Sequence, residues 1–568
     1  MKFRSLLLKV RWADWLIFLF FLITPLVATS LFVDSHIVPK WVWLYFSFSV
    51  LMFLFFLIGF KIEVPLLYLK KTNFYLILIL FLLIKISQLI IHPIAFEAFA
   101  FFDFILFIFI ILVSYNIPQK TEDFLENLQI PFLISNFLVS ARSLFQFYEE
   151  RFLNSNFSHE VFASSFGNVN LLAEFYLINI PLLIYYFKKK NDDLNVVMIQ
   201  NILFIINIFL LYWISSRSAY LALVFCLFYN FYASDLNLKK KLLKLNFITF
   251  LLIIGFHFIW SHGELNMLVD SKSASNFSRK NLLVASFHLI KNNPLGIGTE
   301  KFEFAVAPYR LLTDEPIKES MLDKTPHNEF FRWTIELGWA PLFLIFFTLF
   351  KILKLINTLK QNKAHNYTLY ISLFGIFIFQ ALFQFPLMNA YTFFSFSFWL
   401  GLVFKDNVEM FNSNLTFNLL KKSNLNNTLN FNLYLGRKIL FFIFVISFIF
   451  TFAYSTSEYY KINSDSDISK ISLSCKLMPS NWRSCVHEAE IYFNEKKFEK
   501  SIDLLKTELQ NHPDNFIALK FLTLNYIALK NNEAACKAAL HYEHLLGGKG
   551  QFIPFTNLIC KSNYQPRI

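Results

Sequence analysis

Long apolar runs dominate the chain, and short polar stretches separate them. Roughly 13 of these runs approach the ~20 residues that an α-helix needs to cross a bilayer. They lie near residues 14–33, 42–60, 74–91, 96–115, 129–147, 169–187, 196–214, 217–233, 247–261, 330–349, 367–386, 389–404 and 439–455. A helix satisfies its own backbone hydrogen bonds inside lipid, so each run predicts a membrane-spanning helix. The expected fold is therefore all-α and polytopic, with about 12–13 transmembrane helices.

Two polar stretches interrupt this pattern. The first, residues 262–328, forms a long loop between two apolar runs, and we call it the long loop. The second, residues 456–568, lacks runs of bilayer length and predicts a small soluble α-helical domain. The expected organisation is a membrane domain over residues 1–455 that includes the long loop, followed by the soluble domain.

Composition and charge agree with a membrane protein and give it an orientation. Hydrophobic residues make up 56% of the chain and charged residues 16%, with a formal net charge of +13. Lysines and arginines concentrate on alternate loops, and the positive-inside rule places those loops in the cytoplasm. The expected location is a bacterial inner membrane, with the N-terminus cytoplasmic and both the long loop and the C-terminal domain periplasmic. The positive charge then serves topology and contact with anionic membrane lipids, and we expect no nucleic acid partner.

Residues 482–515 and 516–549 resemble each other at a spacing of 34 residues, the period of tetratricopeptide repeats. Small and apolar residues recur at matching positions, and Pro513 predicts the end of a helix. The segment is similar to a pair of tetratricopeptide repeats, which implies a surface for a protein partner. An unrelated pair of helical hairpins is the alternative.

Cysteine usage fits an oxidising compartment. Cys475, Cys485, Cys536 and Cys560 lie in the C-terminal stretch, and an even number there suggests disulfides. Three pairings are open, of which Cys475–Cys485 and Cys536–Cys560 are local in sequence. Four reduced core cysteines remain the alternative. No metal site is expected, because no closely spaced cysteine pair is present.

The most informative stretch is HNEFFRWTIELGWAP, in which His327 and Asn328 are followed after nine residues by Gly338. It lies where the long loop re-enters the membrane. A histidine there can accept a proton near neutral pH from a hydroxyl group. The alternative is a structural His-Asn pair that caps a helix. Glu336, four residues after Arg332, either pairs with that arginine or orients catalytic groups.

Four stretches in order resemble the superfamily of O-antigen ligases, O-antigen polymerases and bacterial protein O-oligosaccharyltransferases. They are GNVNLLAEFYLINIPL with Asn168 and Asn170, SSRSAYLAL with Ser216 and Arg217, SRKNLLVASFHLIKNNPLGIGTEKF with Arg279, and the His327 stretch. Pro341 departs from the residues common in ligases three positions after the motif glycine, which mildly disfavours a strict ligase.

The resemblance implies a membrane glycosyltransferase of the C type that inverts the anomeric centre and needs no metal or other cofactor. Its donor is a glycan on polyprenyl (undecaprenyl) pyrophosphate, and guanidinium groups suit that pyrophosphate. Arg217 and Arg279 are the expected clamps, with Arg142 as a third candidate, and His327 is the expected catalytic residue. Snorkelling or ordinary solvation of the arginines is the alternative.

The acceptor and the class of protein stay open at this stage. An O-antigen ligase transfers to lipid A-core, a polymerase to another lipid-linked repeat unit, and an oligosaccharyltransferase to a protein hydroxyl group. A ligase-like role in lipopolysaccharide or surface polysaccharide assembly is favoured. A polysaccharide transporter or flippase is the alternative of another class, although we find no inverted repeat of the kind many transporters have.

Overall fold

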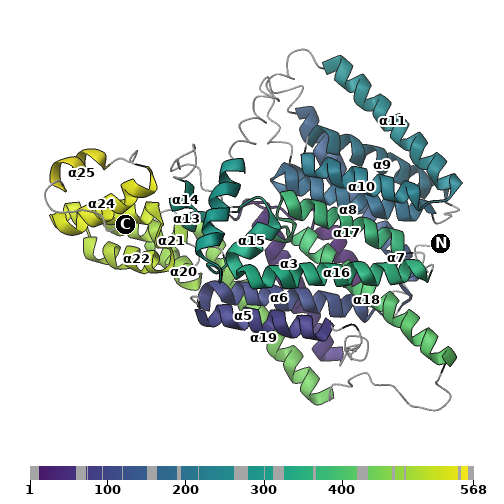
Figure 1. The fold of residues 1–568 in the computed structure, drawn as a ribbon, viewed down its shortest axis with the longest axis horizontal. Helices are drawn as coiled ribbons and strands as arrows, with labels where there is room; N and C mark the ends of the chain where they lie inside the picture. The colour runs from purple at the N-terminus through teal and green to yellow at the C-terminus, as the bar shows by residue number, and fades with distance from the viewer. Residues whose placement is uncertain are drawn as a thin grey trace.

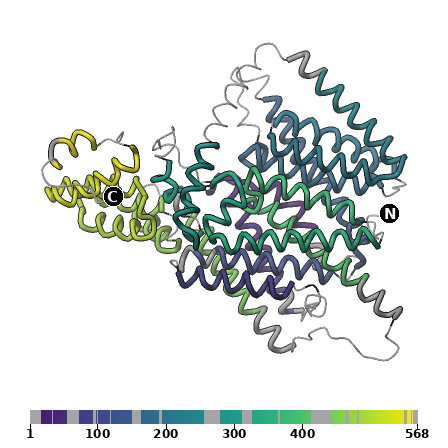
Figure 2. Tube along the Cα trace, viewed as in Figure 1, coloured from purple at the N-terminus to yellow at the C-terminus, as the bar shows by residue number. Residues whose placement is uncertain are grey.

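The computed structural model describes most of the 568 residues, and Figures 1 and 2 show their arrangement. The described residues are 12–32, 34–58, 72, 74–91, 94–117, 119–149, 163–188, 193–214, 216–260, 279–299, 301–310, 325–362, 366–418, 433–463, 467–478, 482–547 and 552–560. Over these ranges the chain forms 22 labelled α-helices, a further helix over residues 279–292, and two short 3₁₀ helices, η3 (Ser164–Phe166) and η4 (Pro386–Met388). The expected all-α fold is confirmed.

Each of the apolar runs expected to span the membrane falls on a helix. These helices are α2 (Trp12–Ile23), α3 (Ile37–Ile58), α5 (Phe74–Ile91), α6 (Ile94–Tyr115), α7 (Thr121–Tyr148), α8 (Val169–Lys188), α9 (Leu194–Ile214), α10 (Arg217–Tyr232), α11 (Leu236–Trp260), α16 (Trp339–Gln361), α17 (Tyr367–Phe383), α18 (Ala390–Asn418) and α19 (Leu433–Asn463). Seven helices among the described residues are long and apolar enough to cross a bilayer, so the chain is a polytopic membrane protein.

Two spans differ from the sequence prediction. The first apolar run continues to about residue 33, but α2 ends at Ile23, two residues before Pro25, whose ring cannot continue a helix. The run expected at 330–349 is divided between the short helix α15 (Glu329–Leu337) and α16, which begins at Trp339. Gly338 separates them with a φ of 91°. Hydropathy alone does not register this break, because α15 mixes its charged side chains with apolar ones such as Phe330 and Ile335.

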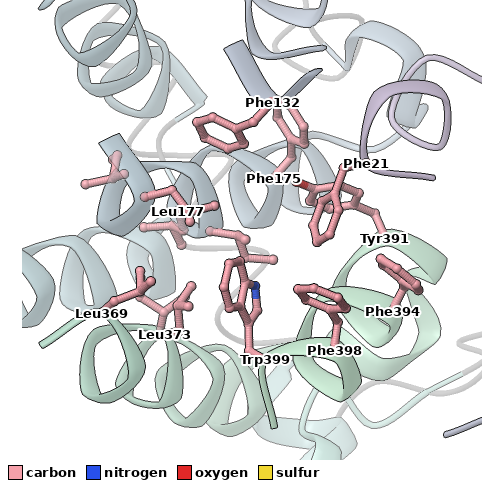
Figure 3. Close-up of a cluster of buried hydrophobic side chains, with 14 of the residues drawn as sticks. Phe21, Phe132, Phe175, Leu177, Leu369, Leu373, Tyr391, Phe394, Phe398 and Trp399 are labelled. Atoms are coloured by element: carbon pink, nitrogen blue, oxygen red, sulfur yellow. The ribbon is translucent and has the colours of Figure 1, made fainter. Parts of the chain in front are cut away.

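Helix α8 lies at the centre of the membrane domain. In the apolar stretch of α8 that is long enough to cross a membrane, 89% of the residues are buried, against 17% in that of α5 at the periphery. Aromatic rings from several helices pack around it, as Figure 3 shows for Phe21 of α2, Phe175 of α8 and Phe398 of α18. Phe21 meets Phe398 edge to face with ring centroids 5.3 Å apart, a favoured aromatic geometry. Such packing holds the helices together where lipid supplies no hydrophobic driving force.

The C-terminal unit, α20–α25, projects from one end of the membrane helices (Figure 1). Its helices are α20 (Ile468–Leu477), α21 (Trp482–Asn494), α22 (Phe498–Asn511), α23 (Phe516–Ala528), α24 (Asn532–Leu545) and α25 (Ile553–Ile559). Helices α23 and α24 begin and end 34 residues after α21 and α22, respectively. Two successive helical hairpins therefore follow the period seen in the sequence. Their membership of the tetratricopeptide class stays a prediction.

The structure joins the four C-terminal cysteines as the two pairs that are local in sequence. Cys475 of α20 is bonded to Cys485 of α21, and Cys536 of α24 is bonded to Cys560 after α25. Each disulfide ties a flanking helix to a hairpin. The fifth cysteine, Cys226, is buried in α10 and reduced.

Candidate functional site

His327 stands immediately before α15, and the structure separates its role from that of Asn328. Asn328 caps α15: its Oδ1 accepts from Phe331 N at 3.0 Å, and its Nδ2 donates to Leu382 O of α17 at 2.7 Å. The capping alternative therefore describes Asn328. His327 has a φ of 52°, a conformation that costs a non-glycine residue about 1–3 kcal/mol, and its ring lies 5.7 Å from that of Phe385. The strain falls on the residue expected to act in catalysis.

Gly338 and the PLGIG turn of the long loop, residues 294–298, form one backbone junction. Ile297 N donates to Ile335 O at 2.8 Å, Gly298 N to Glu336 O at 3.1 Å, and Trp339 N to Pro294 O at 3.1 Å. A Cβ on Gly338 would come within 2.6 Å of Pro294 O. The two glycine motifs are thus two sides of one close contact, and this contact fixes α15 against the loop.

Arg217 is the first residue of α10, and its guanidinium group is exposed. Ser216 precedes the helix, with its hydroxyl 3.2 Å from that of Ser218. Ser218 Oγ in turn donates to Gln380 Oε1 of α17 at 3.3 Å. The motif serines therefore hold the start of α10 against α17. The first turn of a helix presents unpaired N–H groups and a positive dipole end, which favours an anion beside Arg217.

Arg279 is the first described residue of the helix over residues 279–292. Burial lowers the pKa of Arg279, and the positive charge of Arg217 lowers it further. Among the residues that the structure describes, no carboxylate contributes to the electrostatics of Arg279. A partly buried cation beside a like charge is costly without a counter-ion, so the pair is suited to an anionic ligand.

The C-terminal end of α17 brings these parts together. Gln380 receives the hydrogen bond from Ser218, Leu382 O accepts from Asn328, and Phe385 packs on His327. Both the start of α10 and the start of α15 therefore border residues 380–385. The expected catalytic histidine and the helix start that carries Arg217 therefore share one helix end.

The other expected site residues lie elsewhere or act structurally. Arg142 is exposed on α7, where it faces His36 and Lys40 at the start of α3; burial and the Lys40 ammonium lower the pKa of His36, and Arg142 adds to this effect. Asn168 Oδ1 accepts from Asn170 N at 2.8 Å at the start of α8. A donor contact for Arg142 and a direct role for either asparagine stay predictions.

Arg332 pairs with an acid that the sequence analysis did not consider. Its Nη2 donates to Glu329 Oε1, one helical turn earlier, and Glu336 lies close enough to affect both charges. Burial raises the pKa of Glu329 against the opposing effect of Arg332. The interior of α15 thus holds an ion pair, and Glu336 belongs to its surroundings.

Glu174 of α8 is the polar residue that sequence reasoning missed. Its carboxylate is 1% exposed, and Oε2 accepts from Asn389 Nδ2 at 3.1 Å and Thr392 Oγ1 at 2.9 Å. It lines a small cavity with Gln380 and Trp399, and Glu174 Oε1, Gln380 Nε2 and Trp399 Nε1 have no protein partner. An acid in an apolar helix was the available signal. This cavity is lined mainly by apolar side chains, and Gln380 connects it to the α17 side of the site.

Metal ligands do not gather in the described part of the chain, where no three His, Cys, Asp or Glu side chains form a group that could hold an ion. The positive charge at the candidate site comes from the two arginines and the start of α10.

Comparison with known families agrees with the geometry. Residues 202–347 match the model of the family described as O-antigen ligase. The matched segment runs from within α9 into α16 and contains Arg217, Arg279, His327 and Gly338. No curated protein matches the chain. The chain is therefore a multi-pass membrane protein that carries a domain of the O-antigen ligase family.

Proposed function

We propose that the chain is an inverting, metal-independent membrane glycosyltransferase that moves a glycan from polyprenyl pyrophosphate to a hydroxyl group, as an O-antigen ligase does. One observation carries the proposal: the end of α17 contacts both the start of α10, which carries Arg217, and His327, while the charge of Arg217 acts on Arg279. The family match over residues 202–347 supports it.

The arginine pair binds the pyrophosphate of the donor in this mechanism. Guanidinium groups match phosphate oxygens in two-point hydrogen bonds, and the first amides of α10 add a dipole of the same sign. The bond between the anomeric carbon and the phosphate oxygen breaks, and its electron pair leaves with polyprenyl pyrophosphate. The two arginines then offset the negative charge that develops on the leaving group.

His327 acts as the general base for the acceptor. It takes the proton of the hydroxyl group while the oxygen attacks the anomeric carbon on the face opposite the pyrophosphate. The new glycosidic bond forms with inversion, and the proton passes from His327 to the pyrophosphate or to water. The backbone junction between the PLGIG turn and Gly338 keeps α15, and hence His327, in register with the loop that carries Arg279.

Location is a direct test of this reaction, since the lipid-linked donor is used on the periplasmic face. We expect cysteines introduced into residues 262–328, in an active full-length background, to react with an impermeant thiol reagent from the periplasmic side. Cytoplasmic reactivity would overturn the glycosyltransferase proposal and leave the transporter or flippase alternative.

The acceptor is tested in a deletion strain of the source bacterium. A ligase leaves free polymer that is missing from lipid A-core, whereas a polymerase leaves single repeat units on lipid A-core. An oligosaccharyltransferase leaves lipopolysaccharide intact and proteins unglycosylated. We expect the ligase pattern, and unchanged lipopolysaccharide and unchanged glycoproteins together would contradict the proposal.

A further inference from the structure

Two short helices of the long loop, α13 (Phe302–Ala305) and α14 (Ala307–Arg310), follow the PLGIG turn and separate two apolar clusters. In Figure 1 they lie between α15 and the C-terminal unit. One side of this segment contributes Phe302 and Val306, and the other contributes Phe304 and Ala307. We call residues 302–310 the bridging segment.

The first side of the bridging segment packs on the helix that begins with Arg279. Phe302 and Val306 form one buried cluster with Leu282, Ala285, Leu289 and Ile290 of residues 279–292, together with Ile335 of α15. Phe302 and Val306 are each 2% exposed. The position of the bridging segment therefore sets the position of the helix that carries the donor-binding arginine.

The second side inserts into the C-terminal unit. Phe304 is 2% exposed, and its ring centroid lies 5.0 Å from that of Trp482, 5.5 Å from His512 and 6.1 Å from Phe516. These residues belong to or border the hairpins α21–α22 and α23–α24. The buried phenyl ring therefore places the bridging segment inside an apolar cluster of the C-terminal unit, and burial of an aromatic ring stabilises such a contact.

A polar contact beside the ring fixes the register. Glu303 Oε2 accepts from Trp482 Nε1 at 3.1 Å, and Glu303 Oε1 lies 3.6 Å from Arg483 Nη2. The Glu303 side chain is 10% exposed, so this contact is shielded from solvent on one side. The two residues of α21 thus recognise an acidic side chain next to an aromatic one.

The C-terminal unit is itself tied to the membrane domain. Ser457 Oγ of α19 donates to Ser474 O at 3.0 Å, and Ser474 Oγ donates to Ser457 O at 2.8 Å. The unit therefore connects the last membrane helix to the bridging segment. A second tie holds the other end of the PLGIG turn, where Thr299 N donates to Glu97 Oε1 of α6 at 2.7 Å.

We propose that the C-terminal unit is a clamp that positions Arg279 for donor binding, with Glu303 and Phe304 as its positioning residues. The inference rests on the proposed transferase function and deepens it. It also gives the surface around Trp482, His512 and Phe516 an occupant, the chain's own bridging segment. The helical repeats then bind a segment of their own chain.

The test compares full-length wild-type protein with Phe304→Ala. Without the ring, the Arg279 helix samples more positions, and the apparent affinity falls by the fraction of molecules that stay competent. We expect the donor KM to rise about tenfold with kcat within about twofold of wild type, and Phe304→Leu to recover most of the loss. Phe493→Ala is the matched control, because Phe493 packs on Phe498 within the first hairpin, 5.7 Å between centroids.

Hydrogen exchange gives a readout that does not need activity. Amides of residues 279–292 should exchange faster in Phe304→Ala than in wild type and stay protected in Phe493→Ala. Equal exchange in Phe304→Ala and wild type, or equal loss in both variants, overturns the clamp. If Phe304→Ala does not fold, Glu303→Ala replaces it, with faster exchange expected and unchanged exchange overturning the inference. A wild-type protein that transfers no glycan contradicts the proposed function, while exchange still decides the clamp.

Discussion

Arg279 lies in surroundings that disfavour its positive charge, because it is partly buried and the charge of Arg217 acts on it. Residues that serve a ligand often sit in surroundings that the fold alone would not select. Here burial and Arg217 both disfavour the charged guanidinium, and no described carboxylate compensates it. This combination separates Arg279 from Arg332, whose charge has Glu329 beside it.

Replacement of Arg279 by Gln should therefore lower glycan transfer without lowering the stability of the fold. We expect glycan transfer to fall by about 10- to 100-fold, because a charge-assisted phosphate contact worth about 1.5–3 kcal/mol is lost. Thermal unfolding of the ligand-free protein should stay the same or shift slightly upward, because a like-charge repulsion disappears. Lys506→Gln on the exposed side of α22 is a control for general loss of a surface cation. Normal transfer in Arg279→Gln would remove this residue from the donor site.

Residue-level prediction from sequence was uneven for physical reasons. Motif matching singled out His327 and Arg217, and the segments that carry them both contact the end of α17. The sequence left the His-Asn pair open between capping and catalysis, and the bond of Phe331 N to Asn328 Oδ1 assigns the cap to Asn328. Glu174 was overlooked because its partners, Asn389 and Thr392, come from a distant helix.

At the scale of elements, the junction of α15 and α16 is the most constrained local structure of the site. Gly338 and Gly296 both have positive φ, and each faces a backbone atom across the junction. Hydropathy predicted the helices well, since apolar length is a local property. It merged α15 with α16, because the break depends on the PLGIG turn packing from outside the segment.

Gly338→Ala should open this junction. The new Cβ would meet Pro294 O at 2.6 Å, and the φ of 91° disfavours any side chain, so the turn and α15 must move apart. We expect destabilisation of about 1–3 kcal/mol and a loss of transfer that exceeds it, because His327 and Arg279 lose their register. Protease sensitivity of the long loop reports the first effect and a transfer assay the second. Gly375→Ala within α17 is not a suitable control, since it meets Phe225; Ala528→Gly at the exposed end of α23 serves instead. An unchanged loop in Gly338→Ala would contradict the role of the junction.

At the scale of the whole molecule, the C-terminal unit contacts both the last membrane helix and the bridging segment. The hydrogen bond between Trp482 and Glu303 joins residues 179 positions apart, and no repeat in the sequence predicts such a contact. Sequence comparison within the chain predicted the 34-residue spacing of the hairpins, which depends on local packing. The bridging segment packs on part of the C-terminal unit, and a protein partner for the unit stays a prediction.

Reduction of the two disulfides should loosen this assembly. They close stretches of 10 and 24 residues, and native disulfides of this kind are each worth about 2–4 kcal/mol. We expect reductant to lower the thermal stability of the C-terminal unit and to raise hydrogen exchange in α20 and α25 first. A variant with all four cysteines replaced by serine should match the reduced wild type and no longer respond to reductant. Equal stability of the oxidised and reduced wild type would contradict a structural role for the pairs.

The central claim is that His327 catalyses glycan transfer from polyprenyl pyrophosphate. Its most direct test is the release of polyprenyl pyrophosphate by purified full-length protein, given a lipid-linked glycan and lipid A-core as acceptor. We predict acceptor-dependent release by the wild type, and a fall of at least about 100-fold in His327→Ala with unchanged expression and membrane insertion, since general base catalysis contributes that much. His487→Ala, at a half-exposed position on α21, should keep full activity. Full activity in His327→Ala would contradict the account.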